Sequence, residues 1–91
     1  MDIKYEDANV SELIKERISD DNARFWAGDN ISQYLEEGDK QKLIEELTPK
    51  FEAVLDSLVI DRHNDPNSMD TGKRLAKMYI NEIMSGRYDP I

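Results

Sequence analysis

Three basic residues, Lys73, Arg74 and Lys77, lie in the opening turns of a segment whose apolar spacing predicts a helix over residues 72–85. Free backbone N–H groups point out of the first turn of a helix, and together with basic side chains they can bind a phosphate or another anion. Cations at this end of a helix cost roughly a few tenths of a kcal/mol each, unless an acidic neighbour such as Asp70 neutralises them. The pattern therefore predicts either an anion site or a cluster of surface ion pairs.

Groups for catalysis or metal binding are few. The chain has one histidine, His63, and no cysteine, so it forms neither a disulfide nor a thiolate site. Asp61, His63 and Asp65 alternate along a predicted loop, which is a weak ligand set because a metal site needs several converging ligands. No paired base or nucleophile lies near His63 in the sequence. We therefore assign no catalytic residue, no cofactor and no metal site to this chain.

Length and charge limit the classes of function. At 91 residues, 38% hydrophobic and 35% charged, the chain is typical of one small soluble domain. It has neither an apolar segment of membrane-spanning length nor a signal-peptide pattern at its start, so we expect a cytoplasmic protein with no membrane partner.

The net charge of −8 falls within residues 1–60, which hold 15 acidic and 7 basic residues, whereas residues 61–91 hold 5 of each. This balance argues against a nucleic-acid partner, since nucleic-acid binding needs basic patches. The acidic surface is typical of solvated helix faces. The sharper alternative is an imitation of DNA charge that blocks a DNA-binding protein.

Apolar residues three or four positions apart predict an all-α fold with helices over residues 10–18, 40–59 and 72–85. We expect the two long helices to pack as an antiparallel helical hairpin, because a sustained stripe of this kind is the seam of a helix pair. Residues 1–9 are expected to be a frayed tail and residues 86–91 an exit segment, with glycine at position 86 as the helix stop.

Pro49 lies inside the long predicted helix, where proline removes a hydrogen bond at a cost of about 3 kcal/mol. The apolar stripe keeps its phase across Pro49, which favours one helix kinked at that residue. The alternative is a new helix that begins at Pro49 and is capped by Thr48.

Residues 19–38 are expected to form an aromatic arm with turns, in which Phe25 and Trp26 precede a turn signal at residues 28–30. Aromatic side chains serve packing more often than ligand stacking, so we expect the arm to dock onto the core or onto a neighbouring subunit. The residues expected in the core or at a subunit interface are Phe25, Trp26, Leu47, Phe51, Leu55, Leu58, Leu75, Tyr79 and Ile83.

Three stretches carry a family resemblance. They are Asp70-Thr71-x-Lys73-Arg74-x-Ala76-Lys77-Met78-Tyr79-x-x-Glu82-Ile83-x-x-Gly86, then Arg24-Phe25-x-Ala27-x-Asp29-Asn30-Ile31, and residues 55–61 with the loop that follows. Together they resemble the N-terminal helical region of GTP cyclohydrolase I of the bacterial and phage type, and the first stretch is similar to the helix just before the catalytic domain. Gly72 departs from that pattern, which has proline or alanine there.

The resemblance implies a hydrolase family that converts GTP and water into formate and 7,8-dihydroneopterin triphosphate, for example in tetrahydrofolate biosynthesis. The zinc of that family is held by two cysteines and a histidine in a β domain that follows these helices, and none of those motifs occurs here. The resemblance therefore implies a structural, oligomer-forming part that is inactive alone, whose partners are further copies or the missing catalytic domain. The alternative is a stand-alone acidic interaction protein, such as a viral one, that uses a cyclohydrolase-like helical module to bind or inhibit a partner.

Overall fold

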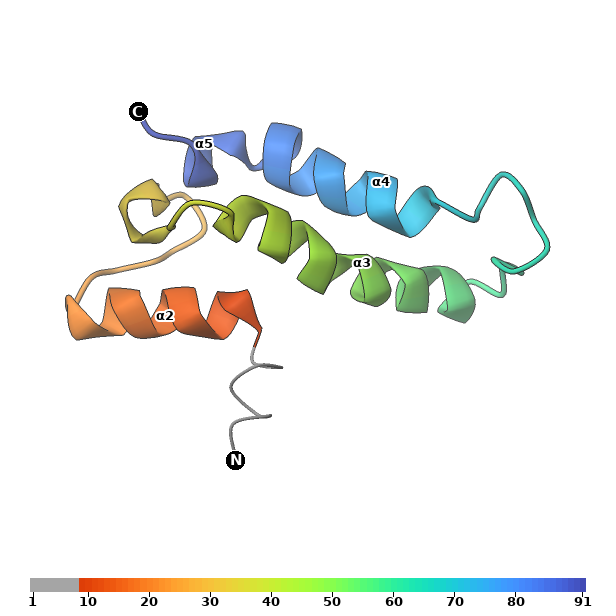
Figure 1. Cartoon of the computed structure of the whole chain (residues 1–91), viewed down its shortest axis with the longest axis horizontal. Helices are drawn as coiled ribbons and strands as arrows, with labels where there is room; N and C mark the ends of the chain where they lie inside the picture. Colours follow the sequence, from red (N-terminus) through yellow and green to blue (C-terminus); the bar gives the residue numbers. More distant parts are fainter. Residues whose placement is uncertain (1–8) are drawn as a thin grey trace.

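The computed structural model describes residues 9–91, which form helices and loops with no strand among them. The all-α prediction is confirmed for these residues, and all but the last residue of the predicted tail over 1–9 lies outside them. The elements, in chain order, are α2 (Val10–Asp20), η1 (Ser32–Tyr34), α3 (Asp39–Ser57), α4 (Thr71–Met78), η2 (Tyr79–Ile83) and α5 (Ser85–Tyr88) (Figure 1).

The long helix α3 runs without a break through Pro49. It follows Gly38, whose left-handed conformation (φ 87°) is one that glycine adopts at little cost. Thr48 does not cap a second helix, because its hydroxyl donates to the carbonyl of Ile44 at 2.7 Å, one turn back in the same helix. The alternative of a new helix beginning at Pro49 is therefore wrong.

The end of α3 comes two residues before the predicted limit at residue 59. There the N–H of Ile60 donates to the carbonyl of Leu55 and the N–H of Val59 to that of Asp56, at 3.1 and 3.0 Å. These two bonds form the closing motif in which the residue after the cap is usually a left-handed glycine. Val59 occupies that position with φ 64°, a strained conformation for a β-branched residue.

The last predicted helix is interrupted. In η2 the N–H of Met84 donates to the carbonyl of Tyr79, five residues back, at 2.9 Å, which is a π-helical turn. Such a turn holds additional residues and so rotates every later side chain relative to the α-helix before it. The short helix α5 follows, so part of the predicted exit segment is helical. Gly86 lies inside α5 without a positive φ and is not a helix stop.

Helix α3 lies between α2 and α4 (Figure 1), and α4 runs alongside it in the opposite direction. A Cβ atom at Gly72 would lie 3.2 Å from the backbone oxygen of Thr48 and 2.6 Å from Cγ of Glu52, so the absence of a side chain lets α4 approach α3 closely. The core cluster consists of Val10, Ile14, Ile18, Ile31, Leu43, Ile44, Ala76 and Ile80.

One buried ion pair ties α2 to the start of α3. Asp39 is only 3% exposed, and its carboxylate accepts from Arg17 Nη1 at 2.7 Å and from the N–H of Glu36 at 2.8 Å. Arg17 Nη1 also donates to the carbonyl of Tyr34 at 2.9 Å. Burial of Asp39 raises its pKa, but the hydrogen bonds from Glu36 and Arg17 outweigh burial and hold the pKa below its ordinary value. Asp39 is thus charged and satisfied inside the fold.

The residues expected in the core or at an interface fall into two groups. Leu55 is buried, and Leu47, Phe51 and Leu75 are half-buried. The remaining residues are not core residues of this chain, because they are exposed: Phe25 by 45%, Trp26 by 68%, Leu58 by 63%, Tyr79 by 38% and Ile83 by 56%.

The small residues of α4 explain part of this division. Gly72 and Ala76, followed one turn later by Ile80, face α3, and these three are buried. Small side chains permit a close helix crossing, so the larger Leu75 and Tyr79 lie on the flank of the helix pair.

Candidate functional site

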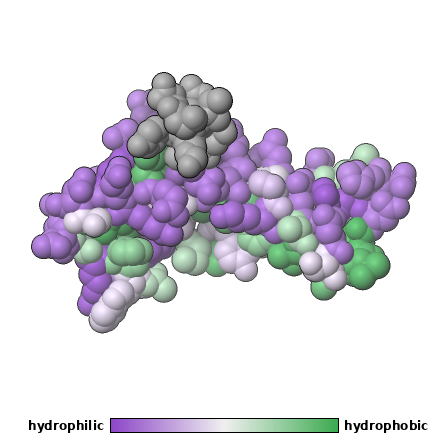
Figure 2. Space-filling model, turned by 90° about the horizontal axis from the view of Figure 1, so that it is seen from below, coloured by the Kyte–Doolittle hydropathy of each residue, from purple (hydrophilic) through white to green (hydrophobic). Residues whose placement is uncertain are grey.

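An apolar surface runs along the C-terminal half of α3 and the adjoining flank of α4. We call it the apolar strip and define it by Phe51 and Val54 on α3, Leu58 at the C-cap of α3, Leu75 on α4 and Tyr79 at the start of η2. Phe51, Val54 and Leu58 are three or four positions apart, which places them on one side of the helix, and the rings of Phe51 and Tyr79 stack with their centroids 5.2 Å apart. Figure 2 shows hydrophobic residues gathered on one side of the molecule, toward the end where α3 finishes.

The exposure of the strip is large for its residue types. Val54 is 52% exposed and Leu58 is 63% exposed, although both continue the stripe that is buried earlier in α3. Contiguous exposed apolar residues on a small protein mark an interaction surface more often than chance. The strip is therefore the main candidate site, and its chemistry is that of a contact surface.

Charges beside the strip are paired. Lys50 lies 3.4 Å from Glu46, and Arg62 lies 2.7 Å from Asp56 and 3.7 Å from Glu52. The hydrogen bond from Arg62 lowers the pKa of Asp56, so this carboxylate stays charged and paired. A second molecule with the same negative net charge meets little local repulsion here.

The predicted anion site lies on the outer side of α4. Lys73, Arg74 and Lys77 are all exposed, and Arg74 Nη2 donates to the hydroxyl of Thr71 at 3.3 Å. Within residues 9–91 none of the three has an acidic oxygen within 4 Å. The side chain of Asp70 makes no capping hydrogen bond. The surface ion pairs expected as one alternative are thus not formed among the described residues.

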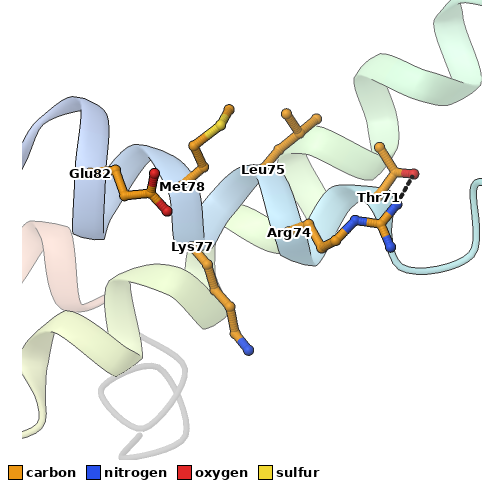
Figure 3. A pocket seen from close by; sticks show the side chains of 6 residues that line it. All are labelled: Thr71, Arg74, Leu75, Lys77, Met78 and Glu82. Atoms are coloured by element: carbon orange, nitrogen blue, oxygen red, sulfur yellow. Dashed lines mark hydrogen bonds between the residues drawn. The ribbon is translucent and has the colours of Figure 1, made fainter.

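Two of these cations border a shallow depression of about 450 Å³. Its lining consists of Thr71, Arg74, Leu75, Lys77, Met78 and Glu82 (Figure 3). Leu75 and Met78 supply apolar surface on one side, and Lys77 extends from the other, while Lys73 does not contribute. The depression holds no buried donors that converge on one point, so its shape suits an amphipathic surface better than a single phosphate.

The loop of residues 24–31 is fastened to the end of the chain by Arg87, a residue that sequence reasoning missed. Arg87 Nη1 donates to the carbonyls of Trp26 at 2.6 Å and Asp29 at 2.9 Å, and Nη2 donates to that of Phe25 at 3.1 Å. The backbone N–H of Ile31 in turn donates to the carbonyl of Arg87 at 2.7 Å. Backbone carbonyls thus dock this loop, and both aromatic rings remain outside.

Arg24 and Asp29 stiffen the same loop. They form a two-fold hydrogen bond with distances of 2.9 and 2.7 Å, and the Arg24 guanidinium lies 4.1 Å from the centre of the Trp26 ring. The hydrogen bond from Arg24 lowers the pKa of Asp29. The exposed ring of Trp26 is thus covered on one face by a cation. The motif signal for a turn at residues 28–30 indicated the bend but not these contacts.

The histidine loop offers no chemistry of its own. Asp61 accepts hydrogen bonds from the side chain of Asn64 and from the backbone of Asn64 and His63, and these bonds lower its pKa. Residues 9–91 contain no group of three or more histidine, cysteine, aspartate or glutamate side chains that could hold a metal ion. A zinc site of two cysteines and a histidine does not fit a chain without cysteine, so we derive no step through zinc.

No helix within the described part of the chain is both long and apolar enough to cross a membrane. No protein-family model, curated protein sequence or solved structure matches this chain. The function is therefore inferred from the chain's own surfaces.

Proposed function

We propose that this chain is a helical assembly module that self-associates through the apolar strip and catalyses no reaction alone. The observation that carries the proposal is the exposure of Val54 and Leu58 by 52% and 63% on a helix whose earlier turns are buried. Burying apolar surface releases about 25 cal/mol per Å². Association would therefore be favourable, because it buries apolar side chains that are exposed to water in the single chain.

A second copy suits the strip for two reasons. A symmetric pair places the same apolar residues on both sides of a two-fold axis, so the surface is its own complement. The charges beside it are nearly balanced, because Lys50 pairs with Glu46, and Arg62 pairs with both Asp56 and Glu52. The strip has only the five residues that define it, whereas a standard interface of about 1,600 Å² has roughly 20–30 residues a side, so we expect a dimer with a dissociation constant in roughly the micromolar range.

The finer form of the proposal follows the family resemblance. In that form α3 and α4 are the helical hairpin, and the loop of residues 24–31 is the aromatic arm, of a cytoplasmic GTP cyclohydrolase I. The partners are further copies or the catalytic domain, and the proposal includes neither nucleic acid nor a membrane. The conversion of GTP would belong to that domain, since this chain carries none of its catalytic residues.

The reading frame beyond Ile91 separates this form from the stand-alone alternative. A downstream β domain with a Cys-x-x-His motif would support the enzyme assignment. A stop codon directly after Ile91 would contradict it and favour an independent acidic interaction protein.

Self-association is tested by sedimentation velocity or light scattering over a range of concentrations. In about 500 mM NaCl, where contacts between exposed charges are screened, the wild-type mass should rise with concentration from one chain toward two, and Leu58→Asp should keep the mass of one chain. Val59→Asp is the matched control, because Val59 is adjacent to Leu58 and 90% exposed but leaves the helical path with a left-handed φ of 64°. A wild type that stays a single chain throughout, or a Leu58→Asp variant that associates as the wild type does, would contradict the proposal.

A further inference from the structure

The outer side of α4 is basic on a molecule whose net charge is −8. Six basic residues of the described part have an acidic oxygen within 4 Å, and these are Lys15, Arg17, Arg24, Lys40, Lys50 and Arg62. Lys73, Arg74 and Lys77 have none among residues 9–91, although carboxylates are abundant in the chain. Three adjacent cations without an ion partner in the described part of the chain form a surface suited to an acidic occupant.

The depression beside these cations adds a second requirement. Leu75 and Met78 are half-buried and line it together with Arg74 and Lys77 (Figure 3). An occupant that fills it must place an apolar side chain on Leu75 and Met78 and carboxylates near the two cations. A free anion would satisfy only the charge, whereas one face of an acidic amphipathic helix would satisfy both needs.

Such a face exists on this chain. The buried residues of α2 are Val10, Ile14 and Ile18, so the opposite side of the helix faces solvent. On that outer side Leu13 is 38% exposed, and Glu16 and Asp20 lie three and seven positions further along. Neither carboxylate has a basic partner within 4 Å among the described residues.

We infer that α2 of one copy docks its outer face into the α4 depression of a second copy. Leu13 contacts Leu75 and Met78 there, and Glu16 and Asp20 face Arg74 and Lys77. Within one copy α2 and α4 lie on opposite sides of α3 (Figure 1), so the two faces meet only between molecules. The contact is head-to-tail and shares only Leu75 with the apolar strip, so copies that use it assemble into rings or chains.

Charge reversal in a Leu58→Asp background tests the contact without the strip. One variant carries Arg74→Glu and Lys77→Glu, and the other carries Glu16→Lys and Asp20→Lys. The Leu58→Asp chain should associate at about 50 mM NaCl and dissociate at about 500 mM, because exposed charge pairs are screened by salt. Each reversed variant alone should associate roughly tenfold more weakly. An equal mixture of the two variants should restore association, because the lysines introduced on α2 would then face the glutamates introduced on α4.

The matched control is Lys42→Glu with Lys50→Glu, which changes the net charge by the same amount on α3. It should associate as the Leu58→Asp background does, and circular dichroism should give the same helix content for all variants. A mixture that stays monomeric would overturn the inference. So would an α4 reversal that lowers the melting temperature without changing the mass, because Arg74 and Lys77 would then stabilise the single chain instead of a contact between copies. Neither result would bear on self-association through the apolar strip, because that proposal is tested by the comparison of wild type with Leu58→Asp.

Discussion

The two halves of α3 carry the same apolar spacing but lie in different surroundings. In the first half Leu43 and Ile44 are 7% and 4% exposed, enclosed by α2 on one side and α4 on the other. In the second half Val54 and Leu58 are 52% and 63% exposed, because α2 does not reach them. The first half is therefore enclosed on two sides. The second half still buries Leu55, which is 7% exposed, and only its face at Val54 and Leu58 is free to contact another molecule.

Helix length accounts for the difference. An α-helix rises about 1.5 Å per residue, so α2 spans roughly 16 Å and α3 roughly 28 Å. With 11 residues against 19, α2 can cover little more than half of its neighbour. A continuous stripe thus predicts a buried face only as far as a partner helix extends.

The largest expected effect separates the two halves directly. Ile44→Ala should lower the free energy of unfolding by about 3 kcal/mol, because it leaves a cavity in the core. Val54→Ala should change it by less than ~0.5 kcal/mol, since the side chain is half-solvated in the single chain. Urea denaturation at low protein concentration measures both values. Equal losses at the two positions would show that the second half is also enclosed.

Removing the charge of Asp39 tests how the covered half is tied to α2. Asp39→Asn should lower stability by about 2 kcal/mol at neutral pH, because Arg17, in a partly buried position, would lose its closest charged partner and keep only Glu36 at 3.4 Å. The pKa of Asp39 is lowered in the folded chain, so its contribution is present above its ordinary pKa and is lost as the pH falls through the folded value. Urea titrations from about pH 7 to about pH 3 should show the two chains converging in stability. A difference in stability between wild type and Asp39→Asn that stays the same across that pH range would contradict a stabilising role of the Asp39 charge.

Gly72→Ala tests the α3–α4 contact, which serves both halves. The added Cβ would meet the backbone oxygen of Thr48 at 3.2 Å, so we expect a loss of about 1 kcal/mol despite the better helix propensity of alanine. Gly86→Ala is the matched control, with nothing within 4 Å of its Cβ, and should stabilise the chain by about 0.5 kcal/mol. Thermal unfolding compares the pair. A gain in stability from Gly72→Ala would show that α3 and α4 can accommodate a Cβ atom at this position without a steric clash.

The smallest effect concerns the end of the uncovered half. Val59→Gly should raise stability by about 0.5–1 kcal/mol, because glycine relieves the strain of a β-branched residue at φ 64°. Helix content by circular dichroism should not change. A loss of stability would mean that the left-handed turn is supported by contacts of the Val59 side chain.

Sequence reasoning predicted the helices, but it did not predict which face of α4 is buried. The all-α class and the continuity of α3 through Pro49 followed from the phase of the apolar stripe. The buried face of α4 did not, because a count of apolar residues favours Leu75 and Tyr79 over Gly72 and Ala76. Small side chains are favoured where two helices cross closely, but the spacing of apolar residues in the sequence does not show where such a crossing lies.

The sequence predicted the basic cluster on α4 but not the contacts that hold the loop of residues 24–31. The basic cluster of Lys73, Arg74 and Lys77 is visible in the sequence, and its place outside the core follows from charge alone. The carbonyl contacts of Arg87 were not predictable, because they join residues 58 to 62 positions apart and follow a π-turn in the last helix. No residue type in that stretch signals the additional residue in the turn.

The most direct test of the central claim is a dilution series followed by methyl NMR of the wild-type chain. If the uncovered half of α3 is the assembly surface, the methyl resonances of Val54 and Leu58 shift with protein concentration while those of Ile18 and Ile44 stay fixed. Resonances of Val54 and Leu58 that do not move between about 10 μM and about 1 mM, a range that spans the expected micromolar affinity, would contradict the account.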